Sequence, residues 1–253
     1  MNTGDFRAHA HELVDWMADY LEQVERLPVK PDVQPGTVLK PLPPAPPDDG
    51  EPFSAVFRDF REIILPGMTH WQHPSFFAYF PANSSPPSIL AEMLTATLGA
   101  QCMSWATSPA ATELEERVME WLRTMIGLPS TFTGVIQDTA STATLCALLT
   151  ARERRSAFRI NERGFAPEMR FTVYCSTEAH SSIEKAVKIA GLGREYLRKI
   201  RVDDDFAMIP SALEEAVTRD LRLGYTPLCV VAAVGTTGST GLDPLRPIAT
   251  LCK

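Results

Sequence analysis

Residues 171–190 read FTVYCSTEAHSSIEKAVKIA, which is an apolar run, then a short polar segment, then a helical pattern. The run 171–175 predicts a buried strand, and residues 182–190 predict a helix that follows it closely. The order recurs downstream, with a helical pattern at 211–223, a strand at 228–234 and a helix at 245–252. Alternating strands and helices indicate a largely parallel sheet covered by helices, so the sequence predicts the α/β class.

Upstream of this region the pattern is helical and rich in proline. Apolar residues at helical spacing predict an amphipathic helix over residues 5–26, and nine prolines then fall within residues 27–52. The proline-rich segment favours an extended path, so we expect the first helix to form an arm that docks on another subunit; a mobile leader with a disordered linker is the alternative. Further helices are predicted at 55–64, 89–98 and 112–126, the last opening with a Thr112 and Glu115 capping box.

Composition limits the class of protein. The 253 residues carry a formal net charge of -7 and have no run rich in lysine and arginine, which argues against nucleic acid or an anionic membrane surface as the main partner. The five cysteines are widely spaced and form no CxxC pair, which is typical of free thiols in a reducing compartment. No apolar run approaches the ~20 residues of a membrane span. We therefore expect a cytoplasmic protein that acts on a small molecule, with no metal site.

Aromatic residues gather at residues 69–81, THWQHPSFFAYFP. The prolines in and around this segment exclude a regular helix or strand, so the sequence predicts an irregular connection. Aromatic walls with a few polar groups suit a ligand pocket, and a loop that plugs the core is the alternative.

Three polar segments follow predicted strands or open predicted helices. Residues 134–144, GVIQDTASTAT, lead into a helical run, so their backbone N–H groups and hydroxyls would form an anion seat; plain capping by Ser or Thr is the alternative. His180 and the loop 235–243, GTTGSTGLD, each come after a predicted strand. Since ligands gather at the carboxyl ends of parallel strands, the three segments predict a site for a phosphorylated cofactor.

Five segments together resemble the pyridoxal phosphate-dependent group II amino acid decarboxylases, and their aromatic L-amino acid branch most of all. They are residues 69–81, 104–109 with 112–115, 134–144, 179–182, and 235–237 with Asp243, in that order. The resemblance implies fold type I, as in aspartate aminotransferase. It also implies an N-terminal arm and substrate-pocket segment over residues 1–85, and the first part of the large cofactor-binding domain over 86–253.

The resemblance also implies roles for individual residues. Ala140 and Ser141 would bind the cofactor phosphate with Thr139 beside them, and His180 would stack on the pyridine ring and handle protons. Thr237 and Asp243 would line the cofactor site. The substrate pocket would be walled by Trp71, Tyr79, Phe80 and Pro81, with Met103 contributed across the interface of a homodimer.

The implied reaction is decarboxylation of an aromatic L-amino acid to the amine and CO2. Histidine at position 180 favours this over an aldehyde synthase; a decarboxylase of a non-aromatic amino acid and an inactive dimerisation or regulatory fragment are further alternatives. Asp138 stands where the family carries glycine. The chain ends at Lys253, before the family's aspartate and anchoring lysine, so we expect a piece of a longer chain or a half completed by a second polypeptide.

Overall fold

The computed structural model describes residues 1–79 and 84–253, which divide into two compact units, 1–99 and 100–253. The N-terminal unit contains α1 (Thr3–Gln23), α2 (Phe53–Asp59) and α3 (Pro86–Leu98), with short helical turns η1 (Val24–Arg26), η2 (Phe60–Ile64) and η3 (Leu65–Gly67). Asn2 and Asp5 form a capping box that fixes the start of α1. Residues 27–52 contain turns and no regular helix or strand, as their prolines predict.

The apolar face of α1 packs within its own chain. Trp16 lies edge-on to Phe57 and Phe60, with ring centroids 6.0 and 5.2 Å apart, and His9 lies 4.7 Å from Phe53. The first helix therefore has a partner on α2 and η2, and its docking on a second subunit stays a prediction.

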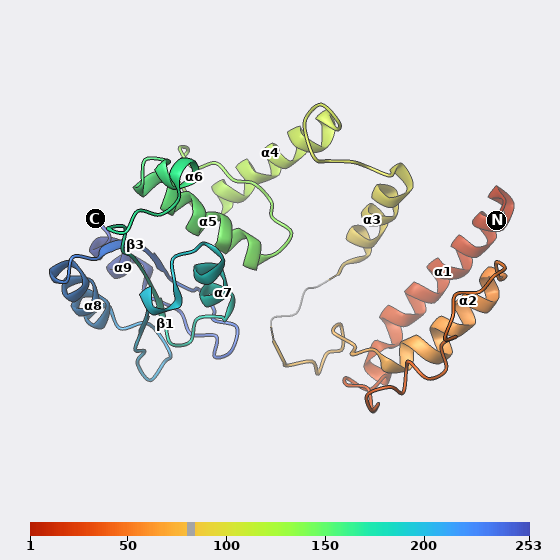
Figure 1. The fold of residues 1–253 in the computed structure, drawn as a ribbon. Helices are drawn as coiled ribbons and strands as arrows, with labels where there is room; N and C mark the ends of the chain where they lie inside the picture. Colours follow the sequence, from red (N-terminus) through yellow and green to blue (C-terminus); the bar gives the residue numbers. More distant parts are fainter. Residues whose placement is uncertain (80–83) are drawn as a thin grey trace. The chain divides into compact units, whose positions relative to one another are not determined.

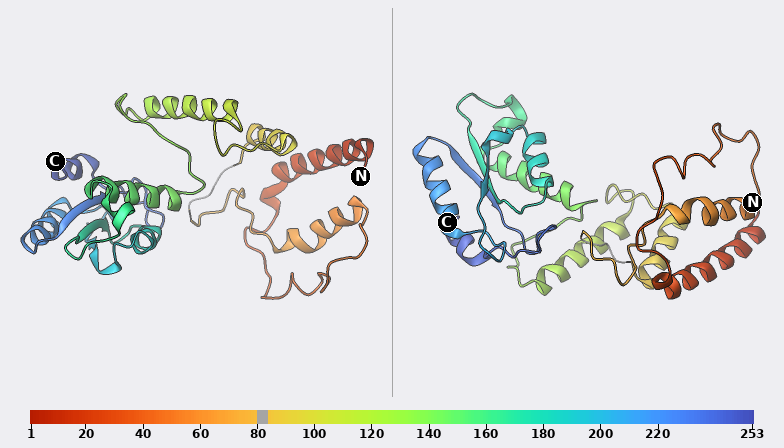
Figure 2. Two further views of the ribbon diagram at one scale, coloured as in Figure 1. Left: turned by 45° about the horizontal axis from the view of Figure 1, so that its top comes forward. Right: turned by 90° about the horizontal axis from the view of Figure 1, so that it is seen from below.

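The C-terminal unit is built on three parallel strands. They are β1 (Phe171–Ser176), β2 (Leu197–Ile200) and β3 (Thr226–Val231), in the order β2-β1-β3. The helices are α4 (Pro109–Met125), α5 (Ala140–Arg155), α6 (Arg159–Arg163), α7 (Ser182–Ile189), α8 (Pro210–Arg222) and α9 (Leu245–Leu251), and η4 (Arg194–Tyr196) precedes β2. Figure 1 and Figure 2 show the strands between helices, so the predicted α/β architecture is confirmed.

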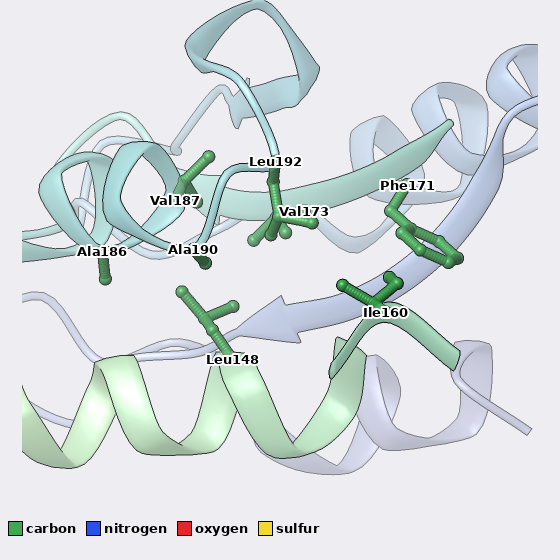
Figure 3. Packing of buried hydrophobic residues seen from close by; sticks show 8 residues of the cluster. All are labelled: Leu148, Ile160, Phe171, Val173, Ala186, Val187, Ala190 and Leu192. Atoms are coloured by element: carbon green, nitrogen blue, oxygen red, sulfur yellow. The ribbon is translucent and has the colours of Figure 1, made fainter. Parts of the chain in front are cut away.

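Two apolar clusters cover the two faces of the sheet. On one face Leu148 of α5 and Val187 of α7 pack against Val173 of β1, as Figure 3 shows. On the other face Tyr174 packs with residues from β2, α8 and α9. All six residues of β1 are buried because helices cover both sides of this central strand.

A buried polar network ties α8 to the sheet. The hydroxyl of Tyr174 donates to Asp220 across 2.9 Å, and the guanidinium of Arg198 on β2 donates to the same carboxylate at 2.8 Å. Burial, together with the negative charge of Asp220, raises the pKa of Tyr174 to about 12. A fully bonded network of this kind fixes α8 against β1 and β2.

Two details of the predicted elements are wrong, and one strand was missed. Helix α4 begins at Pro109, so Thr112 lies inside it and donates its hydroxyl to the Ser108 carbonyl rather than forming a capping box. Strand β3 ends at Val231, and Val234 instead forms an isolated antiparallel bridge with Leu242. Strand β2 was not predicted at all. In the described part of the chain, no helix is both long and apolar enough to cross a membrane.

Candidate cofactor site

Helix α5 opens with two unused backbone donors. Thr139 is the N-cap in an extended conformation, and its hydroxyl accepts the N–H of Thr142 at 3.2 Å. The N–H groups of Ala140 and Ser141 have no hydrogen-bond partner among the described residues, and both residues are exposed. Helix capping and anion binding are therefore compatible here, since the Thr139 hydroxyl caps the helix while the N–H groups of Ala140 and Ser141 remain available for an anion. Asp138 is exposed and is not the cap.

A cavity of about 180 Å³ lies between the start of α5 and α7. Ser141 and Thr142 line it from α5, and Ser182 and Lys185 line it from α7. The structure thus brings the predicted anion seat close to the segment that follows β1. Ligand pockets usually measure about 300–1,000 Å³, so this cavity has room for a small group only, and Leu145, Ala186 and Ile189 form the apolar part of its lining.

His180 lies in the loop between β1 and α7, where the sequence placed it. Its Nδ1 atom is 2.9 Å from the hydroxyl of Ser182, and it accepts the backbone N–H of Ser182 at 3.2 Å. His180 is exposed, whereas Ser182 is buried at 7% exposure. One ring nitrogen is therefore engaged by α7, and the rest of the ring lies open at the strand end.

Asp243 is buried and joins two segments of backbone. One of its carboxylate oxygens accepts the N–H of Met208 at 2.8 Å, and the other accepts the N–H of Ala233 at 2.7 Å. The negative charge also acts on the buried thiol of Cys175 in β1. Burial raises the pKa of Cys175 to about 11, with Lys199 opposing and Asp243 adding to the rise. Asp243 therefore lies near β1, and its carboxylate binds the second residue after the end of β3.

The loop 235–243 is closed by its own hydrogen bonds. The N–H groups of Gly235 and Thr236 donate to the Gly241 carbonyl, and the N–H of Gly241 donates to the Thr236 hydroxyl at 2.9 Å. A Cβ atom at Gly241 would lie 2.4 Å from the Phe206 carbonyl oxygen, so only glycine fits. Thr237 is half-buried within this closed loop. The roles of Thr236 and Gly241 were not predicted, although the repeated glycines signalled a tight loop.

The aromatic segment lies in the N-terminal unit. Trp71 packs on Phe76 and Tyr79, with ring centroids 4.7 and 5.8 Å apart, in an irregular path over the described residues 69–79, as predicted. Trp71 is 43% exposed and Tyr79 75%, so these rings do not plug the core of the unit. Phe80 and Pro81 lie outside the described residues. Met103, in the C-terminal unit, is 77% exposed.

His70 anchors the aromatic segment and was not predicted. It is buried, and its Nδ1 atom lies 2.8 Å from the Tyr20 hydroxyl of α1. Its backbone N–H donates to the Val29 carbonyl. Burial lowers the pKa of His70, and the nearby His73 lowers it further. The only sign of this role in the sequence was the pair of closely spaced histidines in THWQH.

Comparison with known proteins gives one family. A family model described as "Pyridoxal-dependent decarboxylase conserved domain" matches residues 35–253. The whole chain aligns with 54% of a Bos taurus aromatic-L-amino-acid decarboxylase at 43% identity, with 31% of a Drosophila melanogaster histidine decarboxylase at 44%, and with 52% of an Arabidopsis thaliana phenylacetaldehyde synthase at 43%.

Solved structures show the same fold. The crystal structure of Catharanthus roseus tryptophan decarboxylase in complex with L-tryptophan matches all of this chain with 55% of its own, at a TM-score of 0.92 and 36% identity. The chain thus spans about half, or less, of the length of the proteins that it matches. The predicted type I fold is confirmed for the part that is present.

Proposed function

Because the chain belongs to the pyridoxal-dependent decarboxylase family, we propose that it carries the phosphate-binding part of an enzyme that releases CO2 from an aromatic L-amino acid and leaves the amine. The observation that carries the proposal is the start of α5. The backbone N–H groups of Ala140 and Ser141 have no partner among the described residues, and Ser141 shares a cavity with Ser182, two residues from His180.

The residues present fit pyridoxal phosphate. Two backbone N–H groups and the Ser141 hydroxyl, at the positive end of a 16-residue helix, form a donor set for a phosphate. When bound, the cofactor supplies an electron-withdrawing ring that takes up the charge left as CO2 departs. His180, at the end of the central strand, would stack on the ring and hold a proton near the reacting atoms. Asp243 would hold the loop that carries Thr237 in place.

The substrate end of the proposal rests on the aromatic segment. Trp71 and Tyr79 expose their rings, and Phe80, Pro81 and a partner's copy of Met103 would complete the pocket in a homodimer. The similarity to aromatic-L-amino-acid decarboxylase and tryptophan decarboxylase supports an aromatic substrate.

Phosphate affinity tests the anion seat directly. Calorimetry would compare binding of pyridoxal phosphate and of pyridoxal, which lacks the phosphate, to the protein and to Ser141→Asp. The added carboxylate is expected to weaken binding of the phosphate form by about tenfold or more and to leave pyridoxal unchanged. Ser211→Asp, which places the same charge in the first turn of α8, is the control. Equal affinity of Ser141→Asp and wild type for pyridoxal phosphate would refute the seat.

Release of labelled CO2 from carboxyl-labelled tryptophan, phenylalanine and tyrosine tests the reaction. The chain combined with the remaining half of the family's length, with pyridoxal phosphate added, is expected to yield CO2 and the amine in equal amounts. An aldehyde synthase is the second candidate, because one relative is a phenylacetaldehyde synthase. Chromatography of the products separates the two, since CO2 accompanied by an aldehyde in place of the amine would replace the first proposal with the second.

A further inference from the structure

His180 meets two donors from one residue. The backbone N–H of Ser182 donates to Nδ1 at 3.2 Å, and the Ser182 hydroxyl lies 2.9 Å from the same nitrogen. A backbone N–H can only donate, so Nδ1 must accept, and the hydroxyl can then act only as a second donor. In the neutral imidazole the proton is therefore on Nε2.

The position of Ser182 is fixed by the core beneath it. It is the first residue of α7, and Ala186 and Val187 of the same helix are buried in the cluster that packs α7 against α5 and β1. Ser182 is itself buried, while His180 is exposed. The two donors are thus held by a packed helix and act on a ring that is otherwise open to a ligand.

We infer that Ser182 is a positioning residue for His180. Its hydroxyl and N–H orient the imidazole with Nδ1 toward α7 and leave Nε2–H as the group that a ligand meets. The consequence for catalysis rests on the proposed function, in which that ligand is the cofactor with its substrate. In that setting Nε2 is the atom at which His180 holds its proton.

Nitrogen NMR of the histidine rings tests the tautomer on the protein without cofactor. The chain has five histidines, and His180→Gln identifies the signals of His180. Wild type is expected to show a protonated Nε2 and a bare Nδ1. Loss of one hydrogen bond in Ser182→Ala is expected to raise the share of the Nδ1–H form about fivefold. Ser181→Ala, one residue away on an exposed side chain that makes no capping bond, is expected to change nothing.

An isosteric pair guards against a folding defect in Ser182→Ala. Ser182→Thr keeps the hydroxyl and should retain the wild-type ring signals, whereas Ser182→Val has the same shape without the hydroxyl and should shift them as Ser182→Ala does. An unchanged tautomer in both Ser182→Ala and Ser182→Val would overturn the inference, as would an equal shift in Ser181→Ala.

Kinetics supply a second readout that is separate from the first. In the active enzyme, formed with the remaining half of the family's length, Ser182→Val should lower kcat and displace the pH profile relative to Ser182→Thr. Equal kcat and equal pH profiles for the two variants would overturn the role in catalysis. A wild-type chain that releases no CO2 even when combined with the remaining half of the family's length would refute the proposed function, and the NMR comparison would still decide the role of Ser182.

Discussion

Asp243→Ala removes a carboxylate that two backbone N–H groups share, those of Met208 and Ala233. Both bonds are short, at 2.8 and 2.7 Å, and Met208 is fully buried. A buried donor left without an acceptor costs about 1–3 kcal/mol, and the half-buried N–H of Ala233 can be partly hydrated, so the variant should lose roughly 3 kcal/mol of unfolding free energy. Asp243→Asn keeps one acceptor oxygen and turns an NH2 group toward the other N–H, so about half of that loss is expected.

Two measurements on the protein without cofactor test this prediction. Urea unfolding followed by far-UV circular dichroism gives the free energy, and amide hydrogen exchange reports on Met208 and Ala233 individually. Both amides should exchange faster in Asp243→Ala. Asp204→Ala, in the neighbouring loop on an exposed side chain, is the control and should stay within about 0.5 kcal/mol of wild type.

The same experiment separates the two roles considered for Asp243. If the carboxylate acts on the cofactor rather than on the backbone, Asp243→Ala will unfold at the wild-type urea concentration, exchange its amides at wild-type rates and bind pyridoxal phosphate more weakly. That combination would refute the reasoning from hydrogen bonds.

Three further predictions follow from single contacts. The pKa of His70 is lowered in the folded protein, so below about pH 6.5 the unfolded chain binds more protons and the free energy of unfolding falls as the pH is lowered. His70→Gln should make the free energy of unfolding in urea depend less on pH between pH 7 and 5, and an unchanged slope would contradict the prediction. Gly241→Ala should lower the free energy of unfolding by about 1–3 kcal/mol because the new Cβ meets the Phe206 carbonyl, whereas a Cβ at Gly238 has nothing within 4 Å and Gly238→Ala should be tolerated far better. Equal melting temperatures for the two variants would argue against the close approach of Gly241 to Phe206. Burial raises the pKa values of Cys175 and Cys229 to about 11, so iodoacetamide at pH 8 should modify the exposed Cys102 and Cys146 at least about tenfold faster than these two thiols. Peptide mass spectrometry gives the four rates, and equal rates would mean that the sheet opens readily.

The strands show where sequence patterns succeed and fail. Strand β1 was predicted because burial on both faces requires a continuous apolar run. Strand β2 was missed because Arg198 and Lys199 interrupt its apolar residues. Arg198 forms a salt bridge with Asp220 of α8, and Lys199 forms one with Glu184 of α7. Partners this far apart in the sequence are not visible in a local pattern.

The site was predictable in outline only. Residue types and spacing placed Ser141 at a helix start and His180 at a strand end, and the structure has both there. The contacts of the Asp243 carboxylate with backbone N–H groups depend on how two loops meet, and the contact between Ser182 and the imidazole depends on one side-chain rotamer. Neither is encoded by periodicity or by a motif, so both arise only in the folded chain.

The sheet order also implies a sequence of events during synthesis on the ribosome. Val173 pairs with Leu197 of β2 and with Cys229 of β3, so one neighbour of the central strand emerges well before the other. Closing the longer loop costs roughly 0.7 kcal/mol more in chain entropy. The β1-α7-β2 segment can therefore assemble while β3 is still being made, and until then the backbone N–H and C=O groups along one edge of β1 have no strand partner. A nascent chain paused between residues 200 and 226 would be the species that most needs a chaperone.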